Sequence, residues 1–186
     1  MKRIITLFFS LLLVFALSAQ THMEFMGLPI DGKPKKFIAQ LKKKGFEHDK
    51  EFHLFDNLQR LYGSIGGHLC KLHVLSVNKK VSKVTVSYLP SGSWQNTYAF
   101  YKTLQAKYTL KYGEPDSYEV GPNVTNRTYD DIFQNLKTKA TSYSSFYRTD
   151  LGMIGVRIKS DDGKTGYVEI GYEDQVNFYE QERDDI

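Results

Sequence analysis

Residues 69–88 read LCKLHVLSVNKKVSKVTVSY, and this stretch decides the fold class. Apolar and polar residues alternate through 69–77 and again through 81–88, which is the period of a β-strand with one buried face. Residues 78–80, Asn-Lys-Lys, separate the two runs. The segment therefore predicts an antiparallel hairpin that turns at 78–80.

An amphipathic helix is expected on each side of this hairpin. The first helix runs over 34–44, because Pro34 suits a first helical turn and Gly45 suits a stop after the last one. The second helix runs over 94–112, directly after Ser93, which is a favoured N-cap residue. Along the second helix, large side chains recur every three or four positions, which predicts one buried stripe.

Shorter elements complete the expected order. They are strands near 52–55 and 61–64, a third helix lined by Tyr129, Ile132, Phe133 and Leu136, and closing strands over 141–148, 153–160 and 165–172. A turn at 161–164, Asp-Asp-Gly-Lys, joins the last two strands. Short connections between strands favour an α+β fold, with an antiparallel sheet and helices on one face.

The order of a helix followed by strands occurs twice, which raises the hypothesis of two related halves, 21–90 and 91–186. Both expected helices close on lysine and glycine, although these residues are also favoured at helix ends for backbone reasons alone. We expect a single α+β domain over 21–186, because single domains usually have about 100 to 200 residues.

Residues 1–20 have the organisation of a secretory signal peptide. Lys2 and Arg3 precede an apolar run over 4–16, and the small residues Ser18 and Ala19 follow it. The run is shorter than the roughly 20 apolar residues of a bilayer-spanning helix, so no stable membrane span is expected after signal removal. Cleavage after Ser18 and cleavage after Ala19 are both compatible with this pattern. We expect an exported protein, either periplasmic or extracellular.

Charge and cysteine content restrict the function. The chain has 25 Lys and Arg against 21 Asp and Glu, a balance that argues against a nucleic-acid partner. Cys70 is the only cysteine, so no internal disulfide can form. Strand alternation places His68 on the same face as Cys70 and His73 on the opposite face, which favours a buried structural thiol over a nucleophile. The five histidines have no metal-ligand spacing, and we assign no catalytic residue, metal or cofactor.

Aromatic residues are abundant, with 13 Tyr and 12 Phe. Exposed aromatic rings bind sugars and peptides in many exported proteins, whereas rings at helical spacing more often form a core, which is the interpretation we favour. The lysine-rich segment 33–50 has two interpretations as well, contact with a polyanion or acidic lipid and, preferred, a solvated helix face. The candidate binding residues are Trp94, Tyr98, Tyr101, Tyr108, Tyr143 and Tyr147.

Three short segments carry a resemblance to a known group of proteins. They are FMGLPIDG at 25–32, KGF at 44–46 and KYGEP at 111–115. With these turns and helix ends, the chain resembles an uncharacterised exported protein family of Bacteroidetes-type bacteria, and this resemblance implies no residue roles. More loosely, its tandem helix-plus-meander pattern is similar to that of β-lactamase inhibitor proteins and the outer-membrane assembly lipoprotein BamE. That likeness implies a binding role at most, and the chain lacks the lipidation cysteine of BamE.

Two hypotheses of function follow from the sequence. The first is a non-catalytic exported binding or interaction module whose partner is a protein, a peptide or a glycan. The alternative is a small exported hydrolase whose acid and base meet only in the fold. We favour the binding module, because the sequence contains no recognisable nucleophile or metal-ligand motif.

Overall fold

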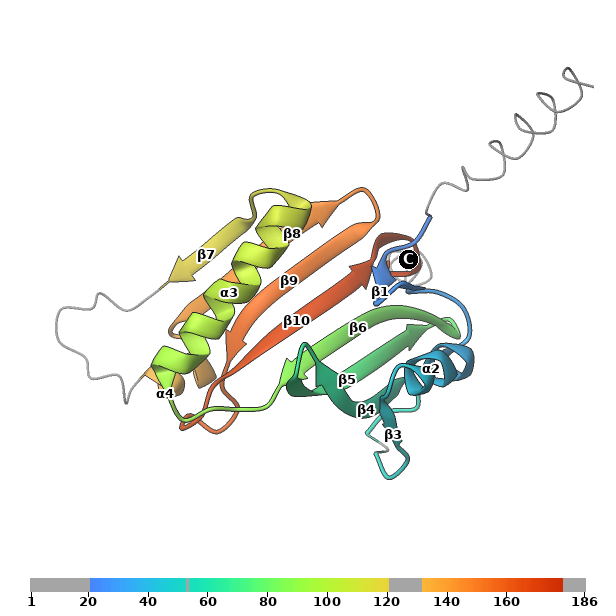
Figure 1. Cartoon of the computed structure of the whole chain (residues 1–186), viewed down its shortest axis with the longest axis horizontal. Helices are drawn as coiled ribbons and strands as arrows, with labels where there is room; N and C mark the ends of the chain where they lie inside the picture. The colour runs from blue at the N-terminus through green and yellow to red at the C-terminus, as the bar shows by residue number, and fades with distance from the viewer. Residues whose placement is uncertain (1–20, 53, 121–131, 179–186) are drawn as a thin grey trace, which may run out of the picture.

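One eight-stranded antiparallel sheet organises the residues that the computed structural model describes, which are 21–52, 54–120 and 132–178 (Figure 1). The strand order across this sheet is β3-β4-β5-β6-β10-β9-β8-β7. The strands are β3 (Glu47–Asp49), β4 (Leu58–Ile65), β5 (His68–Val77), β6 (Lys80–Tyr88), β7 (Asp116–Val120), β8 (Ser142–Thr149), β9 (Gly152–Lys159) and β10 (Tyr167–Asp174).

Helices α2 (Pro34–Lys43), α3 (Trp94–Tyr112) and α4 (Ile132–Lys137) accompany the sheet, and the short strands β1 (Glu24–Phe25) and β2 (Leu28–Pro29) form a separate ribbon. Helix α3 contacts β8, β9 and β10, whereas α2 contacts β3 and β6. Both helices lie on the same side of the sheet in Figure 1. The prediction of an α+β fold with an antiparallel sheet and helices on one face is confirmed.

The alternation that defined the hairpin continues across the sheet. Leu72 pairs with Val86, Val86 with Ile170, and Ile170 with Val156, and all four side chains are buried. Because side chains alternate along a strand, the neighbouring positions point to the opposite face, which the two long helices leave uncovered. The core therefore lies between the helices and one face of the sheet.

The hairpin and the long helix form where the sequence predicted them. The β5–β6 turn consists of Asn78 and Lys79, whose positive φ values of 48° and 64° are those of a two-residue hairpin turn, and Lys80 already belongs to β6. Helix α3 has the predicted bounds, and its N-cap Ser93 accepts a hydrogen bond at Oγ from the Asn96 amide at 3.2 Å. Helix α2 ends one residue earlier than expected, at Lys43.

The expected strand at 52–55 is wrong, because the edge strand β3 forms earlier, at Glu47–Asp49. The Arg60 guanidinium donates two hydrogen bonds to Asp49 Oδ2, at 2.9 and 2.7 Å, and so ties β3 to β4. Phe52 instead leaves the ladder and packs its ring against the same guanidinium, 4.2 Å from the ring centroid.

Strand β7 was not expected, because its polar residues have no apolar alternation. As an edge strand it pairs only with β8, so periodicity gives little signal there. The expected signal peptide at 1–20 and the predicted helix position Tyr129 lie outside the described residues. Within the described ranges, no helix has the length and apolar content needed to cross a membrane.

The two halves repeat the same topology. In each, one long helix precedes four strands that run from an edge of the sheet to its centre, and α4 is an addition between β7 and β8. The last strands of the two halves, β6 and β10, pair with each other. The predicted helix-then-meander order is therefore present twice within one sheet.

The chain near residue 22 is tied to the end of β10 by buried polar contacts. The fully buried Asp174 carboxylate accepts hydrogen bonds from the Met23 amide at 2.8 Å and the Asn177 amide at 3.0 Å. Asn177 Nδ2 donates to the carbonyls of Ile30 and Val81, at 3.0 and 3.1 Å. These bonds fix the β1–β2 ribbon against the centre of the sheet.

Close packing at Gly63 generates a first prediction. A Cβ atom there would lie 2.4 Å from Cδ1 of the buried Phe46 ring. Gly63→Ala should therefore lower the free energy of unfolding by about 1–3 kcal/mol, measured by urea titration. Gly92→Ala is the control, because nothing lies within 4 Å of its Cβ position. Equal unfolding free energies for the two variants would contradict this packing.

Candidate functional site

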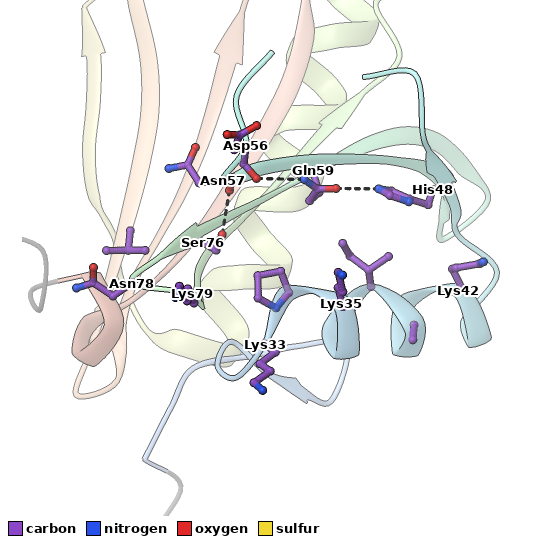
Figure 2. A pocket seen from close by; sticks show the side chains of 14 residues that line it. Lys33, Lys35, Lys42, His48, Asp56, Asn57, Gln59, Ser76, Asn78 and Lys79 are labelled. Carbon is purple, nitrogen blue, oxygen red and sulfur yellow. Dashed lines mark hydrogen bonds between the residues drawn. The ribbon is translucent and has the colours of Figure 1, made fainter. Parts of the chain in front are cut away.

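A groove with a volume of about 1000 Å³ lies between α2, the start of β4 and the β5–β6 turn (Figure 2). Segments distant in sequence form it, because the antiparallel ladder brings the end of β5 next to the start of β4. The lining residues are Lys33, Pro34, Lys35, Ile38, Ala39, Lys42, His48, Asp56, Asn57, Gln59, Ser76, Val77, Asn78 and Lys79.

Helix α2 positions the basic side of this groove. The amphipathic pattern turns Phe37 and Leu41 into the core, whereas Lys35 and Lys42 are exposed. Ile38 lies at the boundary, since it is buried and still lines the groove. One helix thus contributes an apolar wall and a charged rim to the same groove.

Positive charge dominates the groove. Among the described lining residues, the lysines outnumber the carboxylates four to one, because Asp56 is the only acidic residue there. Lys33, Lys35 and Lys42 come from α2 and the residue before it, and Lys79 comes from the β5–β6 turn. A concave surface lined by charge of one sign attracts ligands of the opposite sign.

Hydrogen bonds hold the polar floor of the groove in place (Figure 2). Gln59 Oε1 lies 3.0 Å from His48 Nε2, and Gln59 Nε2 donates to the Asp56 carbonyl at 3.4 Å. Ser76 Oγ donates to the Asn57 carbonyl at 3.1 Å. The floor therefore presents amide and hydroxyl groups in fixed positions.

Ser76 and His48 each have a hydrogen-bond partner within this floor. Ser76 Oγ donates to a main-chain carbonyl and His48 is bound to an amide, so neither contact is the nucleophile-and-base pair that covalent catalysis requires. The described residues contain no cluster of three or more His, Cys, Asp or Glu side chains that could hold a metal ion.

The six aromatic candidates gather between α3 and the sheet instead of around this groove. Trp94, Tyr101 and Tyr147 are only 8%, 0% and 1% exposed, and the other three are half-buried. Tyr101 Oη lies 2.7 Å from Ser145 Oγ, and Tyr147 Oη donates to the Gln105 carbonyl at 2.9 Å. The structure thus places Trp94, Tyr101 and Tyr147 in the core and packs the other three rings against it.

Cys70 and its two neighbouring histidines also occupy the positions that strand alternation predicted. Cys70 is 2% exposed on the helix-covered face, and burial raises the pKa of its thiol to about 11. On that face, His68 packs against the Phe100 ring with centroids 4.5 Å apart, whereas His73 lies on the uncovered face. His53, one of the five histidines, lies outside the described residues.

The groove was missed by sequence reasoning, although part of its signal was visible. The lysine-rich segment 33–50 was interpreted as a solvated helix face. What the sequence does not show is that Lys79 and Ser76 stand opposite α2, more than 30 residues away along the chain.

Comparison with known proteins adds no further assignment. The chain matches no protein-family model, no curated protein and no solved structure. The function is therefore inferred from the geometry of the groove and the charges around it.

Burial of Cys70 predicts slow reaction with thiol reagents. Because the thiolate is the reactive form, a buried thiol with a raised pKa should react at neutral pH at least roughly a hundred times more slowly in the folded protein than in urea. The rate of labelling by a disulfide reagent, followed by absorbance, measures this. Equally fast labelling of the folded protein would show that Cys70 is accessible.

The buried tyrosines predict loss of stability at alkaline pH. Burial raises the pKa of Tyr101 and of Tyr108 to about 12 and also raises the pKa of Tyr172. Folding therefore favours the neutral phenols, and this contribution is complete below about pH 10 and is lost as the pH rises towards 12. Urea titrations across this range should show falling unfolding free energy, with a smaller fall in Tyr101→Phe. A pH-independent stability would contradict the burial of these hydroxyls.

Proposed function

We propose that the protein is an exported, non-catalytic binding module that holds an acidic peptide segment of a partner protein in the α2 groove. The observation that carries this proposal is the combination of a lysine rim, apolar walls and an amide-bearing floor in one groove. The partner is defined by its chemistry, a stretch of chain with acidic side chains and apolar ones between them.

Charge selects an anionic ligand. Lys33, Lys35 and Lys42 are exposed along one side of the groove and Lys79 is exposed on the other, so an acidic segment between them meets cations from both sides. Asp56 is the single opposing carboxylate among the described lining residues. Association should accordingly be fast at low salt and weaken as salt screens the charges.

The spacing of the lysines suits an extended peptide. Lys35 and Lys42 are seven residues apart on a helix, which corresponds to about 10 Å along the helix axis. In the extended polyproline II conformation a chain rises by about 3.1 Å per residue with three residues per turn, so acidic side chains three positions apart share one face and would reach both lysines. Ile38 and Ala39 lie between them and suit an apolar side chain.

The floor favours a peptide over an acyl chain. Asn57, Gln59 and Ser76 present polar groups, which an acyl chain would cover without replacing their contacts to water. A peptide backbone instead offers one donor and one acceptor at nearly every residue. The amide floor therefore complements a peptide better than it complements a lipid tail.

Separate observations bear on the location of the protein and on the alternative function. Export is supported by the basic start, the apolar run and the small residues of segment 1–20. A hydrolase finds less support, since His48 contacts an amide and Ser76 donates to a carbonyl. A binding module requires neither residue to be activated.

Charge reversal on α2 tests the proposal. The probe is a labelled peptide with glutamate at every third position and leucine between, and the readout is fluorescence anisotropy. Lys35→Glu combined with Lys42→Glu should weaken binding about tenfold or more, because each attractive contact becomes repulsive. The helix should remain folded because the two substitutions have opposite effects on it: a glutamate stabilises the first helical turn and destabilises the last one by a similar amount.

The matched control carries the same change of net charge elsewhere. Lys107→Glu combined with Lys164→Glu alters two exposed lysines that do not line the groove. This control should bind the acidic peptide nearly as well as the unmodified protein. An equal loss in both double variants would mean that net charge alone attracts the peptide, and the groove would be ruled out as its site.

A further inference from the structure

The face of the sheet opposite α2 and α3 contains a second, smaller pocket of about 320 Å³. Its floor lies where His73, Thr85 and Gly171 stand side by side on β5, β6 and β10. The remaining lining residues are Phe52, Leu54, Leu58, Lys83, Arg157 and Glu169. This pocket shares no residue with the α2 groove.

Gly171 differs from comparable glycines in what covers it. A Cβ atom on Gly63 would meet the Phe46 ring at 2.4 Å, and one on the neighbouring Gly155 would meet the Phe146 ring at 3.3 Å. Aromatic rings commonly cover glycines in sheets in this way. At Gly171 the nearest atom is Cε of Lys83, at 3.8 Å. The strand thus offers a flat surface large enough to receive a ring from a ligand.

The wall beside this floor is held rigidly. The Arg60 guanidinium lies 4.2 Å from the centroid of the Phe52 ring and is itself bound to Asp49 at 2.7 Å. Phe52 also contacts the His73 ring, with centroids 5.9 Å apart. The aromatic wall therefore keeps its position without a ligand, which reduces the entropic cost of binding.

Polar groups of both hydrogen-bonding types surround the floor. Glu169 supplies acceptors, and Thr85 supplies a hydroxyl that donates and accepts. Burial, together with the nearby Arg60 charge, lowers the pKa of His73, so its neutral ring has one donor and one acceptor. Within the described part of the chain, the ring nitrogens of His73 make no hydrogen bond.

Arg157 favours a negatively charged ligand in this pocket. Its guanidinium lies 5.1 Å from the centroid of the Phe146 ring, and no carboxylate of the described residues lies within 4 Å of it. The other charged groups of the pocket each have a partner of opposite charge, since Lys83 is paired with Glu173, and Glu169 lies 3.6 Å from Lys159. An anionic group on the ligand would therefore find its partner at Arg157.

We propose that this pocket binds a pyranose ring of an acidic glycan, with the ring over Gly171, its hydroxyls at His73, Thr85 and Glu169, and its carboxylate at Arg157. The site is separate from the α2 groove and does not rest on the function proposed for it. A pyranose combines an apolar face, which packs against Phe52, with hydroxyls that both donate and accept.

An aromatic side chain of a protein partner fits this pocket less well. It would cover His73, Thr85 and Glu169 without offering them hydrogen bonds, and each buried polar group left without a partner costs about 1–3 kcal/mol. The mixture of donors and acceptors around the floor thus distinguishes the sugar from the aromatic ring.

Calorimetric titration with two oligosaccharides tests the proposal, using a hexamer of mannuronate as the acidic probe and a hexamer of mannose as the neutral one. Gly171→Val should weaken binding of the mannuronate hexamer about tenfold or more, because the new side chain occupies the floor. The fold should tolerate this change, since a Cβ atom there meets only Lys83 at 3.8 Å. Gly92→Val is the matched control and should leave binding unchanged.

Arg157→Gln provides a second readout that does not depend on filling the floor. It should weaken binding of the acidic hexamer about tenfold and leave that of the neutral hexamer unchanged, so that the preference for the acidic probe disappears. Unchanged affinity in both Gly171→Val and Arg157→Gln would overturn the proposal. Tighter binding of a tyrosine-containing tripeptide than of either sugar, lost in Gly171→Val, would assign the pocket to a protein partner instead.

Discussion

The antiparallel pairing of β6 with β10 is the constraint on which the rest of the structure depends. Val86 stands beside Ile170, and Val84 beside Tyr172, so residues more than 80 positions apart in sequence share one row on the helix-covered face. A slip of one residue would send Ile170 to the uncovered face and bring Gly171 into the core. The continuous core beneath α2 and α3 and the glycine floor of the small pocket both require this register.

The two faces of the sheet have different chemical characters for the same reason. On the helix-covered face, α2 buries Phe37 and Leu41 and leaves its lysines at the edge of the groove. On the opposite face the strands around the small pocket carry mainly polar side chains, and Phe52, from the loop after β3, packs over that face. Lysines around an amide floor suit an acidic peptide, whereas balanced donors and acceptors around a bare glycine suit a hydroxylated ring.

Elements with a local signal could be predicted from the sequence. The alternation in 69–88 and the cap at Ser93 identified the central hairpin and the start of α3 correctly, because period and capping depend on neighbouring residues. Edge strands were harder: β7 was missed, and a strand was expected at 52–55 although β3 forms at Glu47–Asp49. A short edge strand needs no buried face, and its position depends on contacts such as that of Arg60 with Asp49.

The sequence by itself determined the fold class, the burial of Cys70 on one strand face and the presence of an aromatic stripe on α3, since each follows from the spacing of residues along the chain. Only the tertiary structure decided where the two pockets form. Lys35 lies across the groove from Lys79 because α2 packs against β3 and β6, and Phe52 stands beside the floor at Gly171 because its ring packs on Arg60 of β4. No local sequence pattern shows which distant residues become neighbours, because this depends on the register of the whole sheet.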